Sequence, residues 1–144
     1  MIEYNCRMGD PETEVVLPRL KNDLAELLLA AANQGLDKVK IETDPRFACA
    51  VVAVSGGYPG DYEKGLSISG LENVKTTKGI LFHAGTKIKD DQIVTNGGRI
   101  LCMTSFGSSV ELAVQRSLFE LEKVSFTGMS YRRDIGYEFY EEES

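Results

Sequence analysis

The sequence predicts an α+β protein built from two unequal pieces, residues 1–43 and 44–144. In the first piece, a short strand-like segment precedes apolar residues that recur at helical spacing. In the second, short apolar segments are separated by glycine and aspartate pairs, which are typical of hairpin turns, and an amphipathic helix follows. We therefore expect a strand with helices, then an antiparallel β-sheet domain with a covering helix.

The N-terminal segment 2–8 alternates like a β-strand. A period of two places Glu3, Asn5 and Arg7 on one face and apolar side chains on the other. The sharp break that follows, at Gly9, marks the end of this strand.

Two helices are expected after this strand. Asp10 is a good N-cap for a short helix over 11–17, with proline and glutamate in its first turn. Pro18 is tolerated only in a first turn, so a second helix is predicted over 18–34, ending at Gly35 as the left-handed residue after the helix.

The second piece begins with a change from helical to strand character. Strands are predicted over 47–57, 66–70, 79–84, 92–95 and 99–105. Asp90-Asp91 and Gly97-Gly98 separate the later ones as hairpin turns. Ser108 or Ser109 is expected to cap a last helix over 109–123.

Composition excludes several classes of protein. The 144 residues carry a net charge of −6, which argues against a nucleic-acid interface. A run of about 18 apolar residues, as a membrane span requires, is absent, and so is a signal peptide. The cysteines, Cys6, Cys49 and Cys102, form no paired motif and are expected to be reduced, inert thiols in a cytoplasmic protein.

The polar face of segment 2–8 is the first candidate site. Glu3 and Asn5 offer a carboxylate and an amide oxygen, the ligands that Mg²⁺ prefers. Arg7, one step further on that face, is suited to clamping a phosphate or carboxylate. The alternative is an ordinary solvated strand face.

The other polar candidates also have structural explanations. Asp10 and Glu12 start a helix, where both capping and an anionic ligand are possible. Lys87 and Arg99 flank one hairpin and either meet as a cationic pair or are solvated charges. His83 lacks a nucleophile motif nearby, so a structural role is expected.

Six segments resemble, in the same order, those of the glycinamide ribonucleotide synthetase (phosphoribosylamine–glycine ligase) family of ATP-grasp enzymes. They are IEYNCRMGDPETE, PRLKNDLAELLLAA, GGYPGDYEKG, FHAGTK, VTNGGRILCMTSFG and YRRDIGY, and they cover essentially the whole chain. Met8 replaces the bulkier Phe or Leu usual before the Gly-Asp-Pro-Glu motif. The resemblance implies that residues 1–43 end an ATP-grasp domain and that 44–144 form the family's C-terminal domain.

The resemblance also implies roles for individual residues. Glu3 and Asn5 match the ligands that hold Mg²⁺ or Mn²⁺ against the ATP phosphates, and Arg7 would lie beside the transferred phosphoryl group. The residues matching the pocket for glycine and 5-phosphoribosylamine are Gly9, Asp10 and Glu12. Lys87 and Arg99 stand where related ATP-grasp enzymes bind the ribose phosphate, a weaker transfer because it crosses subfamilies.

The implied reaction joins glycine to 5-phosphoribosylamine through glycyl phosphate, with ATP as co-substrate. Most of the ATP site would lie upstream of this chain, so we expect a truncated ligase that is inactive alone and that self-associates. A sister ATP-grasp purine ligase and a non-catalytic C-terminal module are the alternatives.

Overall fold

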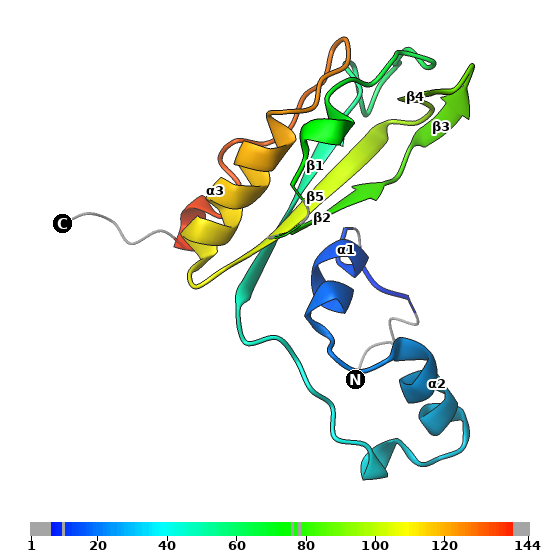
Figure 1. Ribbon diagram of the computed structural model, residues 1–144, viewed down its shortest axis with the longest axis vertical. Helices are drawn as coiled ribbons and strands as arrows, with labels where there is room; N and C mark the ends of the chain where they lie inside the picture. Colours follow the sequence, from blue (N-terminus) through cyan, green and yellow to red (C-terminus); the bar gives the residue numbers. More distant parts are fainter. Residues whose placement is uncertain (1–6, 10, 76, 78, 140–144) are drawn as a thin grey trace, which may run out of the picture. The chain divides into compact units, whose positions relative to one another are not determined.

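The computed structural model divides the chain into two compact units, Met1–Arg46 and Phe47–Ser144 (Figure 1). The structure describes residues 7–9, 11–75, 77 and 79–139. The predicted strand 2–8 therefore falls almost wholly outside the described residues, together with the predicted ligands Glu3 and Asn5 and with Asp10. The two units are described separately below.

The first unit is helical in the part that the structure describes. Its elements are α1 (Thr13–Val16), the 3₁₀ turn η1 (Leu17–Arg19), α2 (Leu24–Ala32) and the 3₁₀ turn η2 (Leu36–Lys38). The predicted helix 11–17 is therefore shorter, with Glu12 rather than Asp10 at its N-cap position.

The second predicted helix begins later than Pro18. Pro18 lies in η1, after which Leu20 is extended, with a ψ of 124°. The cap is Asp23, whose carboxylate accepts hydrogen bonds from the N–H groups of Ala25 and Glu26. A side chain that satisfies two otherwise unpaired donors outweighs a proline that merely fits a first turn.

The end of α2 also differs from the prediction by one residue. Gln34, not Gly35, takes the left-handed conformation, with a φ of 55°. The N–H of Gly35 donates to Ala30 O (2.8 Å) and that of Gln34 to Ala31 O (3.1 Å). This pair of bonds is the Schellman arrangement, which caps the last carbonyls of a helix.

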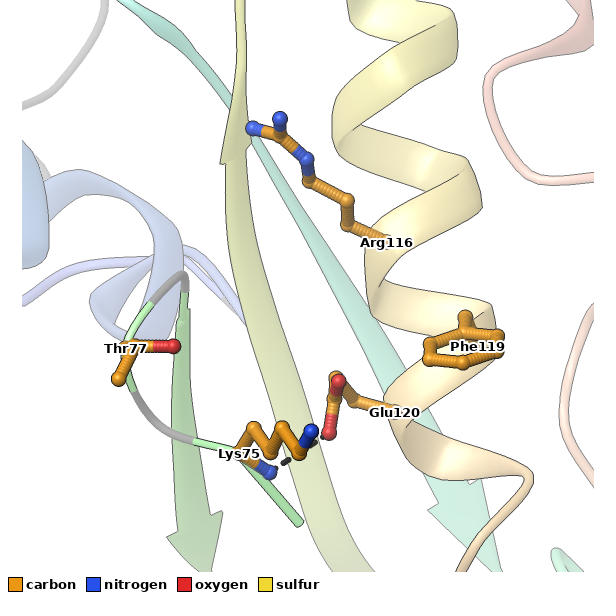
Figure 2. Close-up of a pocket in the computed structure, with 5 residues that line it drawn as sticks. All are labelled: Lys75, Thr77, Arg116, Phe119 and Glu120. Carbon is orange, nitrogen blue, oxygen red and sulfur yellow. Dashed lines mark hydrogen bonds between the residues drawn. The ribbon is translucent and has the colours of Figure 1, made fainter.

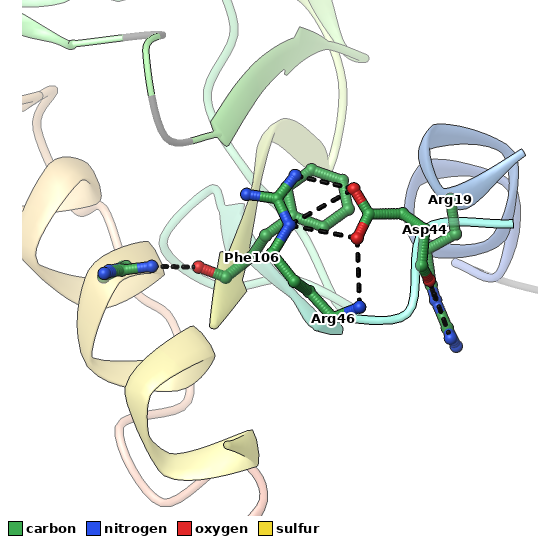
Figure 3. A network of polar contacts seen from close by, with 5 residues as sticks. Arg19, Asp44, Arg46 and Phe106 are labelled. Atoms are coloured by element: carbon green, nitrogen blue, oxygen red, sulfur yellow. Dashed lines mark hydrogen bonds and ion pairs between the residues drawn. The ribbon is translucent and has the colours of Figure 1, made fainter. Parts of the chain in front are cut away.

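Asp44 organises the end of the first unit (Figure 3). Its carboxylate accepts from Nε and Nη2 of Arg46, at 3.0 and 2.6 Å. Its backbone carbonyl accepts from the Arg19 guanidinium, and its N–H donates to Arg19 O at 2.6 Å. The hydrogen bonds from Arg46 lower the pKa of Asp44, with the bond from its side chain as the largest cause.

In its described residues, the second unit contains two antiparallel sheets and one covering helix. Strands β1 (Phe47–Val54), β5 (Arg99–Gly107) and β2 (Gly79–His83) form a sheet in the order β1-β5-β2. Strands β3 (Thr86–Lys89) and β4 (Gln92–Thr95) form a hairpin, and α3 (Val110–Leu121) packs on β1 and β5 (Figure 1). The short 3₁₀ turns are η3 (Leu71–Asn73) and η4 (Tyr137–Phe139).

Most of the predicted strands are confirmed in this unit. Segment 66–70 is the exception, because it forms only isolated bridges, Ser67 with Val94 and Ser69 with Ser125. Strand β3 was not predicted, because it is largely exposed and its sequence, with two lysines in four residues, lacks the apolar alternation of a half-buried strand. The final helix is confirmed, with Ser109 as the cap: its hydroxyl accepts from the Leu112 N–H.

The core of this unit lies between α3 and the sheet. Alternate β1 residues, Cys49, Val51 and Ala53, are buried beneath the helix, and Ser117 Oγ of α3 donates to Cys49 O at 2.8 Å. Burial raises the pKa of the Cys49 thiol to about 11, so this thiol is protonated and unreactive at neutral pH. No helix in the described ranges is long and apolar enough to cross a bilayer.

Candidate functional site

Three glycine-containing segments that are far apart in the sequence meet at one end of the three-stranded sheet. They follow β1, follow β2 and precede β5. The N–H of Ser55 donates to Gly98 O (2.8 Å), that of Gly85 to Arg99 O (2.8 Å), and that of Asn96 to Gly85 O (2.6 Å). We call this arrangement, with Gly85, Gly97 and Gly98 at its centre, the glycine cluster.

Close backbone approach explains the glycines of this cluster. A Cβ atom at Gly97 would lie 3.1 Å from the Cα of Gly85. One at Gly98 would overlap the ring of Tyr58, and one at Gly85 would overlap Arg99 O. These glycines are therefore required by packing, which gives them a structural role.

Ser55 anchors the turn before β5. Its side chain is 2% exposed, and its hydroxyl donates to Gly97 O at 2.9 Å, while its own N–H bonds Gly98 O. The position of Arg99, which opens β5, therefore depends on a buried serine that sequence reasoning did not select. A serine directly before a glycine pair at the end of a buried strand was the available signal.

Lys87 and Arg99 do not face each other across the hairpin. The cross-strand partner of Lys87 is Val94, whereas Arg99 lies opposite Val54. A backbone hydrogen bond connects their segments, because Arg99 O accepts from the N–H of Gly85, the residue directly before β3. The two residues are therefore not cross-strand partners, and both side chains are exposed in the neighbourhood of the glycine cluster.

Lys87 lines an open hollow of ≈ 340 Å³, here called the Lys87 hollow. His83 and Thr86 form its polar wall, and His83 Nδ1 lies 3.1 Å from Thr86 Oγ1. Ile88 and Ile93 form the apolar wall. The sequence did not point to Thr86 or to either isoleucine, because strand β3 was not anticipated.

The described candidates of the first unit lie in one short segment. Arg7 Nη1 donates to Met8 O at 2.9 Å. The carboxylate of Glu12 accepts from the Gly9 N–H at 2.7 Å, and the Glu12 N–H donates to Gly9 O at 3.1 Å. Glu12 thus closes a tight turn before α1. These contacts give Glu12 a capping role and do not test its predicted role in substrate binding.

Within the part of the chain that the structure describes, no group of three or more His, Cys, Asp or Glu residues is arranged to hold a metal ion. The predicted ligands Glu3 and Asn5 lie outside that part. Their residue types, a carboxylate and an amide oxygen, fit a hard divalent cation such as Mg²⁺.

Comparisons with known proteins agree with one another. The chain is 50% identical over 137 residues to phosphoribosylamine–glycine ligase from Pseudomonas aeruginosa, and similarly to that of Vibrio cholerae. It is 51% identical over 138 residues to a bifunctional purine biosynthetic protein from Dictyostelium discoideum, of which it covers 17%. The match covers 95% of this chain but 32% of the Pseudomonas protein, so the chain spans about a third of the bacterial relatives.

A solved structure gives the same result for the fold. The crystal structure of phosphoribosylamine–glycine ligase from Thermotoga maritima matches 93% of this chain, with a TM-score of 0.70 and 39% identity, over 32% of its own length. Residues 48–138 match the family model described as "Phosphoribosylglycinamide synthetase, C domain". The chain therefore belongs to the phosphoribosylglycinamide synthetase C-domain family.

Proposed function

We propose that this chain is the C-terminal part of an ATP-dependent ligase that joins glycine to 5-phosphoribosylamine, giving glycinamide ribonucleotide, ADP and phosphate in purine biosynthesis. The observation that carries the proposal is the 50% identity to phosphoribosylamine–glycine ligase along 95% of the chain. A cytoplasmic location accords with this assignment.

The N-terminal segment would supply one side of the reaction centre, as the end of an ATP-grasp domain. Glu3 and Asn5 would hold Mg²⁺ or Mn²⁺, which when bound neutralises phosphate charge on ATP. Arg7 would act as the catalytic cation beside the γ-phosphate. Gly9, Asp10 and Glu12 would line the pocket for glycine and 5-phosphoribosylamine.

The second unit would bind the ribose phosphate of 5-phosphoribosylamine through Lys87 and Arg99. Both are exposed, and Arg99 is placed by the backbone bonds of the glycine cluster. An ammonium and a guanidinium offer the donors that a phosphate group accepts. The neighbouring Thr86 could add a hydroxyl donor from the wall of the Lys87 hollow.

The reaction would proceed in two steps. The glycine carboxylate attacks the γ-phosphorus of ATP, breaking its bond to the bridging oxygen and releasing ADP. The amine of 5-phosphoribosylamine then attacks the acyl carbon of glycyl phosphate, and phosphate leaves as the amide forms and a proton is lost. The residues contribute by orienting the reactants and balancing charge.

A chimera tests this proposal. The C-terminal third of the Pseudomonas aeruginosa ligase would be replaced by this chain, and phosphate release would be measured with ATP, glycine and 5-phosphoribosylamine together. We expect activity from the chimera and none from the 144-residue chain alone. An inactive but folded chimera would favour a non-catalytic module instead, and a different substrate requirement would favour a sister ATP-grasp ligase.

Matched substitutions in the chimera then test the phosphate site. Lys87→Ala and Arg99→Ala should each raise the KM for 5-phosphoribosylamine about tenfold or more and leave the KM for glycine unchanged. Lys89→Ala removes an equally exposed lysine from the same strand and should have little effect. Equal effects of Lys87→Ala and Lys89→Ala would contradict the assignment of Lys87.

A further inference from the structure

The side chain of Tyr58, in the loop that follows β1, packs on the turn that opens β5. A Cβ atom added at Gly98 would meet the Tyr58 ring first, because the three heavy atoms nearest to it, outside its chain neighbours, all belong to that ring. The two residues are far apart in the sequence. A glycine at position 98 therefore lets a distant aromatic ring lie directly against the backbone.

Hydrogen bonds from Ser55 hold the same turn. The Ser55 N–H donates to Gly98 O at 2.8 Å, and the Ser55 hydroxyl donates to Gly97 O at 2.9 Å. The Tyr58 N–H donates in turn to Ser55 O at 3.1 Å, so the residue that carries the ring is tied to the residue that anchors the turn. Ser55 thus fixes the two carbonyl groups of the turn, and the Tyr58 ring fills the space that a side chain at Gly98 would need.

The Tyr58 ring has a second partner within its own loop. The centres of the Tyr58 and Tyr62 rings are 6.1 Å apart, with 57° between the ring planes, which is a favourable tilted arrangement. Lys64 Nζ lies 5.8 Å from the centre of the Tyr62 ring. Tyr58 is 39% exposed, yet these contacts and Gly98 restrict where its ring can lie.

Arg99, the residue after this turn, opens β5 at a bulge. Val54 of β1 lies opposite Arg99, whereas Ala53 lies opposite Leu101, so Ile100 is an extra residue in β5. A bulge changes the direction of the side chains beside it. The direction of Arg99 is therefore not set by a regular strand pairing alone, and it depends on the turn that precedes it.

We propose that Tyr58 is a positioning residue for Arg99, whose guanidinium it directs toward the ribose phosphate of 5-phosphoribosylamine. This inference rests on the proposed function, in which Arg99 binds that phosphate. The pair Gly97-Gly98 has wide backbone freedom, so without the ring on Gly98 the turn would present Arg99 in several directions. Holding a binding group in one direction before the ligand arrives lowers the entropic cost of binding.

The contact itself is tested in the 144-residue chain by NMR. The ring current of Tyr58 should displace the Gly98 Hα resonances in the wild type and in Tyr58→Phe, and this displacement should vanish in Tyr58→Leu. The order parameter of the Arg99 amide should fall in Tyr58→Leu alone, while the amide resonances of α3 stay unchanged as evidence of an intact fold. An Arg99 amide that is equally ordered in Tyr58→Leu would overturn the proposal.

The effect on substrate binding is tested in the chimera with the Pseudomonas aeruginosa ligase. Tyr58→Leu should raise the KM for 5-phosphoribosylamine about tenfold and leave the KM for glycine unchanged, whereas Tyr58→Phe, which keeps the ring, should resemble the wild type. Tyr58→Leu should add no further rise in a chimera that already carries Arg99→Ala, because Tyr58 acts through Arg99. Tyr137→Leu removes a tyrosine that is 56% exposed in η4 and is the matched control, without effect on either KM.

The outcomes separate this inference from the proposed function. If Arg99→Ala raises the KM for 5-phosphoribosylamine and Tyr58→Leu does not, the role of Tyr58 alone is overturned. Effects of the two substitutions that multiply would also overturn it, since Tyr58 would then act independently of Arg99. If Arg99→Ala leaves this KM unchanged, the proposed phosphate site is wrong and the role of Tyr58 is overturned with it.

Discussion

Glu120 shows how a single carboxylate joins two elements of the second unit. It is 9% exposed and links α3 to the segment before β2 through the Lys75 N–H, while Lys123 balances its charge. Because hydrogen bonds hold its pKa below the ordinary value of 4.5, this interaction contributes fully above pH 4.5. Its contribution is lost as the pH falls through the lowered pKa of the folded state.

Glu120→Gln should therefore lower the free energy of unfolding at pH 7 by about 1 kcal/mol. The difference between the variant and the wild type should shrink as the pH drops below 4.5, which urea unfolding at pH 7 and at acid pH would measure. Glu122→Gln is the control, since that carboxylate is exposed and pairs only with Arg133 among the described residues. A Glu120→Gln effect that does not depend on pH would contradict the charge argument.

Ser55 is the second residue on which a local arrangement depends. Ser55→Ala leaves Gly97 O without its buried hydroxyl donor, so we expect a loss of about 1–2 kcal/mol in the free energy of unfolding. Chemical denaturation checks this value. Ser108→Ala, at an exposed serine before the cap of α3, should change it by less than about 0.5 kcal/mol. Similar values for the two variants would show that the Ser55 hydroxyl does not hold the turn.

At the scale of elements, the β3–β4 hairpin is closed by an unfavourable pair of turn residues. Asp90 and Asp91 have φ values of 49° and 57°, and Lys89 pairs directly with Gln92 across a two-residue loop. Positive φ at both positions is the type I′ geometry, for which Asn-Gly is preferred. Replacing the pair by Asn-Gly should raise the free energy of unfolding by about 0.5–1 kcal/mol, measured by urea denaturation.

A matched variant checks that the gain comes from turn geometry rather than from removed charge. Asp90→Asn with Asp91→Asn removes the same two carboxylates but provides no glycine. It should stabilise the protein less than the Asn-Gly pair. If both variants gain equally, relief of charge repulsion is the cause.

The sequence predicted elements well where one local signal dominated. Apolar alternation and glycine or aspartate punctuation located β1, β2, β4, β5 and the turn at Asp90-Asp91. The predicted start of the second helix was wrong because two signals competed. Pro18 fits the first turn of a helix, but Asp23 accepts hydrogen bonds from two backbone N–H groups and caps α2. Strand β3 was missed because exposed lysines dominate its sequence.

The candidate sites were less predictable, since they depend on contacts between distant segments. Spacing suggested Lys87 and Arg99 as neighbours, but their backbone connection runs through Gly85, and Lys87 itself pairs with Val94. A hollow lined by Lys75, Thr77, Arg116, Phe119 and Glu120 combines a flank of α3 with a segment some forty residues earlier, joined by the Glu120 bond to the Lys75 N–H (Figure 2). A linear pattern gives no indication of such a juxtaposition.

At the scale of the whole molecule, the chain joins a small unit, helical in its described part, to a larger α+β unit. The larger unit has a continuous core between α3 and the sheet, and the family match, residues 48–138, falls within it. In the helical unit, Leu27 is the one described residue of α2 that is buried. The larger unit therefore buries far more apolar surface within itself than α2 does in the helical unit.

This difference underlies the last prediction, which is self-association of the isolated chain. Leu28 and Leu29 of α2 are 62% and 64% exposed, and apolar surface of this kind favours association. Sedimentation velocity should show a concentration-dependent rise in mass, which Leu28→Gln with Leu29→Gln reduces. Ala25→Gln, at an exposed position of the same helix, should leave association unchanged. A wild-type chain that stays monomeric at the highest concentrations would contradict the expectation, whereas association unaffected by the double variant would place the contact elsewhere.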